Sequence, residues 1–318
     1  MCKFFIGFSY FIYHVSRFFL HFFSMTESIK ESRKSVIEDI SDGERFSISL
    51  IYDEVKELEE LRNIFYKYVK NCVLPSTASS SYYDGCDCED DCGSEDCGCK
   101  STHGFFYVSR GLNTIFLQST SILPNISIYE CNSNCSCSPS ICPNRLTQHG
   151  VSLPLQVFKS DSGCGWGVRS HMRKIRKGEF VCEYAGEIIK TDEARRRWIT
   201  AKEKNEDNYI LCLKEHVQDR VLRTNIDPTH IGNVGRFINH SCDPNLQIFL
   251  TRINSLIPTA ALFAKRDIEI NEELSFDYAG GMNDNNDNMQ EINTNVERKK
   301  CLCGSQYCKK YLPFDQSL

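Results

Sequence analysis

Nine cysteines in two groups constrain this chain more than any other feature of its sequence. Five of them lie in GCDCEDDCGSEDCGCKS at residues 85–101, and four follow in CNSNCSCSPSIC at residues 131–142. A chain of 318 residues, 41% of them hydrophobic, can bury a core without disulfide staples. Clustered cysteines in a chain of this length therefore indicate a metal site, and the odd number would leave an unpaired thiol in a disulfide knot.

The nine thiols suit a cluster of three zinc ions. Zinc takes four ligands in a tetrahedron, so three ions need twelve bonds, which nine sulfurs supply when three of them bridge two ions each. Cys-x-Cys pairs favour such sharing, because neighbouring ligands reach neighbouring metals. The predicted ligands are Cys86, Cys88, Cys92, Cys97, Cys99, Cys131, Cys135, Cys137 and Cys142.

This cysteine pattern, followed by Cys-Pro-Asn-Arg, resembles the pre-SET region of SET-domain histone-lysine methyltransferases. The resemblance is to the class that acts on lysine 9 of histone H3, in which nine cysteines hold a triangular three-zinc cluster. It assigns residues 85–149 to the pre-SET region. Two spacings depart from the family pattern: four residues separate Cys137 from Cys142 where relatives usually have three, and the step from Cys88 to Cys92 is tight.

The sequence from residue 153 onward predicts a β-rich domain. Six strand-like runs, LQVFK, EFVCEY, YILCL, VLRTNI, LQIFLTR and TAALFAK, are separated by turn signals. A helix is predicted at TDEARRRWIT, with Thr191 as its cap. The runs resemble the SET fold at residues 153–279. The expected fold class is mainly β with short helices: small curled sheets with a threaded C-terminal segment, flanked by a three-zinc pre-SET cluster and a one-zinc post-SET tail.

Four short motifs extend the resemblance and imply a site for S-adenosylmethionine. GCGWGV is similar to the turn that opens the cofactor site, and CEYAGEII to the family's Tyr-x-Gly-Glu strand. GRFINHSCDPN matches the Arg-Phe-x-Asn-His-Ser-Cys signature, and EELSFDY matches the strand that ends in the catalytic tyrosine. The family usually has Lys or Arg at the place of Cys164. The residues implied to bind the cofactor are Cys164, Gly165, Trp166, Tyr209, Arg236, Asn239 and His240.

Methyl transfer from a sulfonium to a lysine requires an oriented, neutral amine in a desolvated channel. By resemblance, Tyr278 orients the amine and helps its deprotonation, Tyr209 lines the channel and touches the cofactor, and Phe276 leaves room for a second or third methyl group. The implied activity is di- or trimethylation of lysine 9 of histone H3. Lysine 36 of histone H3, a non-histone lysine, and a catalytically silent chromatin-binding protein of the same fold are the alternatives.

The C-terminal KKCLCGSQYCKKYLPF carries three cysteines, one fewer than a zinc tetrahedron needs. The resemblance supplies the fourth ligand from the NHSC motif and implies a post-SET zinc that ties residues 299–315 over the active site. The expected ligands are Cys242, Cys301, Cys303 and Cys308. The Asn-rich segment 280–298 is expected to be a flexible linker.

The first 84 residues give weaker signals. Residues 1–24 form a hydrophobic extension that resembles the start of a signal peptide, but no small-x-small cleavage motif follows, and polar residues interrupt it before the ~20 apolar residues of a membrane span. An upstream extension before a start at Met25 is one alternative, and a secreted or membrane-anchored cysteine-rich protein is another. Residues 25–84 are predicted to hold a polar segment and a helix. Apolar residues there recur at helical spacing, namely Val55, Leu58, Leu61, Phe65, Tyr68 and Cys72.

The net charge of −5 argues against a protein that grips DNA by bulk electrostatics. A basic peptide is an easier partner, so the expected partners are the histone H3 tail and chromatin, with neither strong direct DNA binding nor a membrane. Thiols must stay reduced to bind zinc, which argues against secretion. The expected location is the nucleus, on the chromosome.

Overall fold

The computed structural model of the chain describes residues 35–64, 67–75, 83–89, 92–93, 96–109, 115–118, 127–279 and 298–313. The extension at residues 1–24 and nearly all of the linker at 280–298 lie outside these ranges. Among the described residues, no helix is both long enough and apolar enough to cross a membrane.

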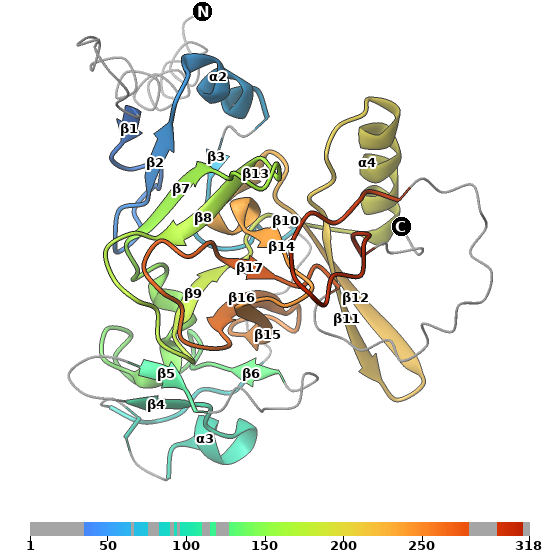
Figure 1. Cartoon of the computed structure of the whole chain (residues 1–318). Helices are drawn as coiled ribbons and strands as arrows, with labels where there is room; N and C mark the ends of the chain where they lie inside the picture. Colours follow the sequence, from blue (N-terminus) through green and yellow to red (C-terminus); the bar gives the residue numbers. More distant parts are fainter. Residues whose placement is uncertain are drawn as a thin grey trace, which may run out of the picture. The chain divides into compact units, whose positions relative to one another are not determined.

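Small sheets make up the described part of the chain, as the sequence predicts (Figure 1). One sheet has the order β1 (Ser35–Ile37), β2 (Ser49–Tyr52), β7 (Leu155–Lys159) and β8 (Trp166–Ser170). A second has the order β6 (Ile128–Tyr129), β15 (Leu246–Arg252), β16 (Thr259–Ala264) and β9 (Phe180–Glu183). A third has the order β10 (Glu187–Ile189), β12 (Arg220–Asp227) and β11 (Leu211–Val217). Each of the six predicted runs overlaps one of these strands, which confirms the expected mainly β fold.

Three strand pairs and short helices complete the architecture. The pairs are β3 (Lys67–Tyr68) with β13 (Ile231–Gly232), β4 (Tyr107–Ser109) with β5 (Ile115–Leu117), and β14 (Asn239–His240) with β17 (Ser275–Phe276). The helices are α2 (Val55–Ile64), α3 (Gly98–His103), α4 (Thr191–Glu203) and the 3₁₀ helices η1 (Pro143–Arg145), η2 (Thr147–His149) and η3 (Val234–Phe237).

An aromatic core joins the cysteine-rich region to the second sheet. β16 is central in that sheet, and its continuous apolar run is buried because strands flank it on both sides. The ring of Phe263 lies 5.4 Å from that of Phe180 and 5.6 Å from that of Phe249. Tyr107 of β4 and Leu117 of β5 pack into the same cluster. The cysteine-rich region is therefore fixed to the second sheet by its own hairpin.

The C-terminal segment runs beside the NHSC segment. β14 and β17 pair in parallel, with Asn239 opposite Ser275 and His240 opposite Phe276. The side chain of Asn245 holds the same crossing, since its Oδ1 accepts the backbone N–H of Ser275 at 2.9 Å and its Nδ2 donates to the carbonyl of Glu273 at 2.8 Å. This crossing brings together residues that are more than thirty positions apart in the sequence.

The N-terminal helix is shorter than its apolar pattern predicts. α2 ends at Ile64, Phe65 lies outside the described residues, and Tyr68 belongs to strand β3. Tyr68 is buried and donates its hydroxyl to Glu44 at 3.0 Å, while the strand pairs with Ile231–Gly232. Tertiary pairing therefore overrides helical spacing here. The predicted polar segment also contributes β1 and β2 to the first sheet.

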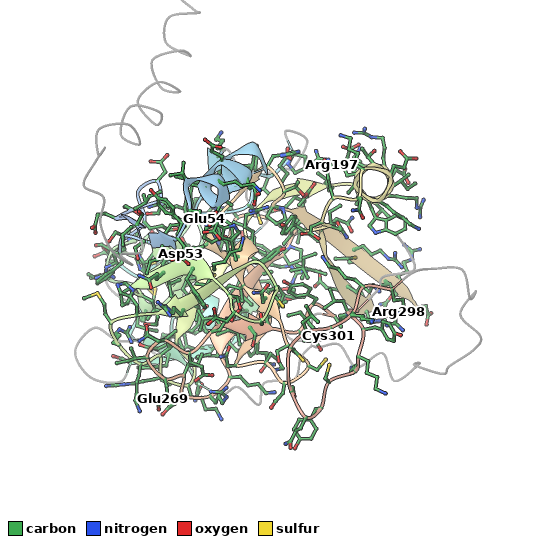
Figure 2. The ribbon with its side chains drawn as sticks, turned by 45° about the horizontal axis from the view of Figure 1, so that its top comes forward. Asp53, Glu54, Arg197, Glu269, Arg298 and Cys301 are labelled. Carbon is green, nitrogen blue, oxygen red and sulfur yellow. The ribbon has the colours of Figure 1, made fainter. Side chains whose placement is uncertain are left out.

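Helix α4 forms where it is predicted, but its cap differs. Lys190 precedes the helix without a side-chain cap, and the hydroxyl of Thr191 instead accepts the Asn225 amide at 3.3 Å. Arg197 anchors the helix (Figure 2). Its guanidinium contacts Glu187 and Asp227, each at 2.8 Å, so α4 is clamped onto the β10–β12 pair.

Candidate active site and zinc clusters

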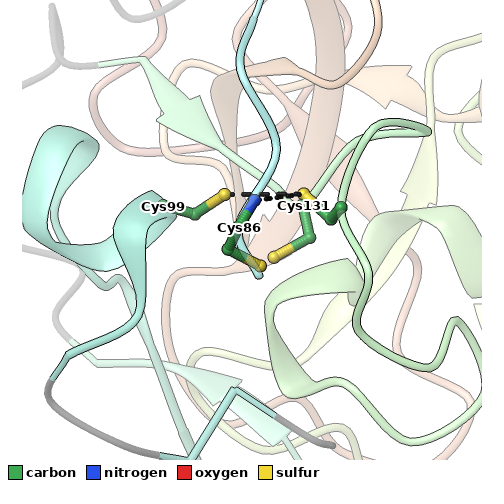
Figure 3. A group of neighbouring side chains, drawn as sticks. Cys86, Cys99 and Cys131 are labelled. Carbon is green, nitrogen blue, oxygen red and sulfur yellow. Dashed lines mark hydrogen bonds between the residues drawn. The ribbon is translucent and has the colours of Figure 1, made fainter. Parts of the chain in front are cut away.

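The nine cysteines between residues 86 and 142 form one buried cluster, as the sequence predicts. Cys99 comes from α3, Cys86 from the loop before it and Cys131 from the segment after β6, and their side chains converge (Figure 3). Three sets of four have all sulfurs within 4.8 Å of one another: Cys86, Cys99, Cys131 and Cys135; Cys86, Cys88, Cys92 and Cys97; and Cys86, Cys92, Cys131 and Cys137. The donor set and its spacing fit tetrahedral zinc.

The geometry indicates which three sulfurs are shared. Cys86, Cys92 and Cys131 recur in more than one set, and their sulfurs lie at 3.6 Å from Cys86 to Cys92 and 3.8 Å from Cys92 to Cys131. Cys142, which none of the three sets contains, interacts with Cys131 and Cys92. When Cys142 replaces Cys86 in the third set, the three sites use each of the nine sulfurs and share those of Cys86, Cys92 and Cys131.

Two of the three Cys-x-Cys pairs in this cluster are divided between neighbouring sets, whereas Cys86 and Cys88 share one set. Cys97 and Cys99 belong to different sets, and so do Cys135 and Cys137. Adjacent ligands thus reach neighbouring metal positions. The wider step from Cys137 to Cys142 is accommodated by a turn in which the N–H of Cys142 donates to the Ser138 carbonyl at 3.1 Å.

A buried arginine faces this cluster. Nine thiolates carry −9 and three zinc ions +6, which leaves −3 in a largely dry environment. Arg145 is 5% exposed, and its guanidinium donates to the sulfur of Cys137 at 3.5 Å and to the carbonyl of Asn132 at 2.8 Å. The amide of Asn144 donates to the sulfur of Cys131 at 3.5 Å. We therefore propose that these two residues of the Cys-Pro-Asn-Arg motif stabilise the thiolates.

Replacing Arg145 with Met is expected to speed zinc release from this cluster about 10- to 100-fold, the usual effect of losing a group that supports metal ligands. The rate of zinc release from Arg145→Lys should lie between those of wild type and Arg145→Met, because lysine keeps the charge but lacks the forked guanidinium donor. Zinc transfer to a metallochromic chelator measures the rate. Equal rates for wild type and Arg145→Met would contradict the role, and Arg298→Met is the matched control on an exposed arginine.

The four remaining predicted metal ligands also come together. The sulfurs of Cys242, Cys301, Cys303 and Cys308 lie within 4.8 Å of one another. Cys242 approaches Cys301 at 3.9 Å and accepts the backbone N–H of Lys309 at 3.3 Å. The tail therefore docks on the NHSC segment through a donor set that fits one zinc ion. Lys299 adds an ion pair to Asp207, and Figure 2 shows Cys301 and Arg298 in this tail.

Two of the predicted catalytic and channel residues, Phe276 and Tyr278, lie in one aromatic cluster with Tyr184. The ring of Phe276 is 4.9 Å from that of Tyr278 and 5.6 Å from that of Tyr184. Tyr184 donates its hydroxyl to the backbone carbonyl of Tyr209 at 2.7 Å. Tyr184 lies in the CEYAGEII motif, where nothing in the local sequence predicts this contact. Tyr184 therefore connects the ring of Phe276 to the backbone of Tyr209.

The hydroxyl of Tyr278 has a defined direction. It donates to the carbonyl of Ile238 at 3.0 Å, and the backbone N–H of Tyr278 donates to Nδ1 of His240 at 3.2 Å. Burial, followed by the neighbouring Tyr209 and Cys164, raises the pKa of Tyr278. The hydroxyl therefore stays protonated at neutral pH, although 36% of the residue surface remains exposed.

Glu273 organises the residues around the glycine-tryptophan turn. Its carboxylate accepts the Asn239 amide at 2.8 Å and the Ser160 hydroxyl at 2.7 Å. A Cβ on Gly167 would lie 2.7 Å from Glu273 Oε1, so a larger residue there would displace this carboxylate. Asn239 also donates to the Trp166 carbonyl at 3.0 Å. The role of Glu273 could not be predicted from local sequence, because its partners are distant along the chain.

The other predicted cofactor residues surround the same segments. Gly165 has a φ of +83° at the turn, which glycine adopts without strain. Arg236 is buried, donates to the Pro228 carbonyl at 3.1 Å, and lies over the ring of Tyr209 at 4.3 Å. This placement favours a positioning role toward Tyr209. The ring of His240 is occupied, with Nε2 at 3.4 Å from the Cys242 sulfur, which leaves its backbone for other contacts.

Comparison with known proteins accounts for this arrangement. Residues 41–145 match the pre-SET motif, and residues 165–279 match the SET domain. Over 239 residues the chain is 43% identical to the probable histone-lysine N-methyltransferase set-23 of Caenorhabditis briggsae, covering 74% of this chain and 89% of that protein. The chain belongs to the SET-domain histone-lysine methyltransferases. The pre-SET match begins well before Cys86, the first cysteine of the cluster, and it includes strand β2.

Two other comparisons support this assignment. The chain is 45% identical over 194 residues to human SETMAR, and the match covers 60% of this chain but only 28% of SETMAR. The crystal structure of the SETMAR methyltransferase domain has a TM-score of 0.69 at 34% identity, and the match covers 88% of this chain and 98% of that structure. KRYPTONITE, solved with mCHH DNA, an H3(1–15) peptide and SAH, has a TM-score of 0.66 at 28% identity, covering 92% of this chain and 57% of KRYPTONITE.

Proposed function

We propose that this methyltransferase uses S-adenosylmethionine to di- or trimethylate lysine 9 of histone H3, on chromatin in the nucleus. The observation that carries the catalytic part is the convergence of the Tyr278 hydroxyl, the Phe276 ring and the Tyr209 segment beside the NHSC crossing. The nine-cysteine pre-SET cluster and the H3 peptide in the KRYPTONITE complex support the choice of lysine 9.

The residues around the glycine-tryptophan turn fit the cofactor. Gly163 and Gly165 have φ values of +79° and +83°, and a Cβ on Gly165 would meet no atom within 4 Å, so an open space adjoins this turn. Asn239 is held by Trp166 and Glu273, which keeps the adjoining backbone in place. When bound there, S-adenosylmethionine supplies an electrophilic methyl group on a sulfonium.

The chain's own residues then prepare the lysine. Only the neutral amine has the lone pair that attacks, and a free lysine with a pKa near 10.4 is mostly charged at neutral pH. The apolar rings of Phe276 and Tyr184 disfavour the cation and so lower the pKa of a lysine that enters. The protonated Tyr278 hydroxyl orients the amine, and the amine proton leaves to solvent before transfer.

Replacing Phe276 with Tyr is expected to shift the products from di- and trimethyl-lysine toward monomethyl-lysine. Phe276 is fully buried against Tyr278, so an added hydroxyl would occupy space in the channel and hold a water molecule there. Mass spectrometry of a methylated H3 peptide measures the product states. Unchanged product states at equal turnover would contradict the assignment, and Phe249→Tyr, in the separate aromatic cluster around Phe263, is the control.

A peptide array with labelled cofactor tests the choice of lysine. The proposal expects label on H3 peptides that contain lysine 9, and loss of this label when that lysine is replaced by alanine. Label that depends on lysine 36 instead, the second site that the sequence left open, would replace the proposal. Cofactor binding without any label would favour the catalytically silent alternative.

A further inference from the structure

An open pocket of about 700 Å³ lies beside the connection from β8 to β9, in a part of the chain that the catalytic proposal does not use. Four of its lining residues are basic: Arg173, Lys174, Arg176 and Lys177. They share no residue with the aromatic cluster around Tyr278. Figure 2 shows Glu269, the ion-pair partner of Lys174, at the edge of the molecule and away from Arg298 of the post-SET tail.

Backbone hydrogen bonds hold the segment that carries these four cations in place. Ile175, in the middle of the basic run, is fully buried and exchanges two backbone hydrogen bonds with Ile268, at 3.0 and 2.8 Å. Gly178 turns the chain with a φ of +84°, and its carbonyl accepts from Leu117 at 2.9 Å. With Ile175 pointing inward, the basic residues on either side of it are left at the surface.

The carboxylates of the pocket do not cancel this charge. Glu179 is almost buried and is already used by the Arg173 guanidinium at 3.0 Å and the backbone N–H of Arg176 at 2.7 Å. Asp267 accepts the backbone N–H of Lys177 at 2.8 Å. Within the described part of the chain, no carboxylate forms an ion pair with the exposed side chains of Arg176 and Lys177. Four cations against Glu179, Asp267 and Glu269, the ion-pair partner of Lys174, leave a local charge of +1 on a chain whose net charge is −5.

We propose that this basic pocket binds the phosphate backbone of the DNA that is wrapped around histones, and thereby brings chromatin to the enzyme. The inference rests on the proposed function, because a histone tail in chromatin is presented next to DNA. A chain with net negative charge is repelled by DNA unless it carries a local cluster of cations. Arginine and lysine together suit phosphate contacts that carry no sequence information.

The double variant Arg176→Ala/Lys177→Ala tests the pocket. Binding of the full chain to a short mixed-sequence DNA duplex, followed by fluorescence anisotropy, should weaken about tenfold or more, and the slope of log K against log salt should become less steep by about 2. Methylation of nucleosomes should fall in parallel, while methylation of the free H3 peptide stays unchanged. The variant Lys56→Ala/Lys70→Ala removes the same charge from another exposed region and should change neither.

Each outcome separates the two proposals. If wild-type protein does not methylate the H3 peptide, the proposed function fails whatever the DNA result. If the peptide is methylated but the double variant keeps wild-type DNA affinity and nucleosome activity, the pocket proposal is overturned. Weaker binding to polyglutamate with unchanged DNA binding would overturn it too, because the pocket would then recognise an acidic protein.

Discussion

Replacing Tyr278 with Phe is expected to slow methyl transfer about 10²- to 10⁴-fold, the range for a group that assists proton transfer and orients a reacting atom. The change removes only the hydroxyl that donates to the Ile238 carbonyl at 3.0 Å. The ring contact with Phe276 and the backbone bond to His240 remain available, so the fold and cofactor binding should be kept.

Single-turnover kinetics with H3 peptide and calorimetric cofactor titration measure the two quantities separately. Tyr311→Phe, on an exposed tyrosine of the post-SET tail, is the matched control. A Tyr278→Phe enzyme with near wild-type single-turnover rate would remove this residue from the catalytic machinery. Loss of cofactor affinity together with the rate would indicate that the tyrosine supports the cofactor site and not the amine.

The pH profile distinguishes the ionisation of the tyrosine from that of the substrate. Burial raises the pKa of Tyr278, so the hydroxyl is protonated throughout the neutral and mildly alkaline range. The value of kcat/KM should nevertheless rise with pH, about tenfold per unit, because it depends on the neutral fraction of the free lysine, which rises below the amine pKa of about 10.4. The same slope at a lower rate is expected for Tyr278→Phe. A flat profile for the variant would show that ionisation of Tyr278 sets the slope.

Replacing Cys131 with Ser is expected to remove the pre-SET zinc ions and to prevent the pre-SET region from folding. The sulfur of Cys131 belongs to two of the three inferred sites, so its loss removes one bond from each of two metals. Each of these metals is also joined to the third metal by another bridging sulfur, Cys86 or Cys92. A structural zinc contributes on the order of 10 kcal/mol to folding, which is comparable with the whole stability of a domain. Zinc content should fall from about four per chain to about one.

Cys308→Ser gives the contrasting result. Its sulfur belongs only to the post-SET set, so the expected zinc content is about three per chain, with the pre-SET cluster and the main sheets retained. Elemental analysis of the purified full chain, together with titration of free thiols, measures both variants. Equal zinc loss in the two variants would contradict the assignment of Cys131 as a shared ligand.

Local patterns in the sequence were sufficient for much of this protein. The six strand runs are strands because alternating and apolar segments bounded by turns have few other stable conformations. The thirteen predicted metal ligands gather in two clusters, since thiol spacing is a direct constraint on tetrahedral geometry. The helical pattern over Val55–Cys72 failed in its second half, where Tyr68 gains more from burial and strand pairing than from continuing α2.

The sequence by itself determined the kind of site to expect: which thiols could bind zinc, which tyrosine is the catalytic candidate, and which domain holds them. Only the tertiary structure decided how these parts are shared and supported. The sulfurs of Cys86, Cys92 and Cys131 recur in more than one set of four, and Glu273 supports Asn239, through contacts between residues six to thirty-nine positions apart. Hydrophobic and cysteine patterns report local geometry, whereas these contacts depend on how separate loops meet after the sheets have packed.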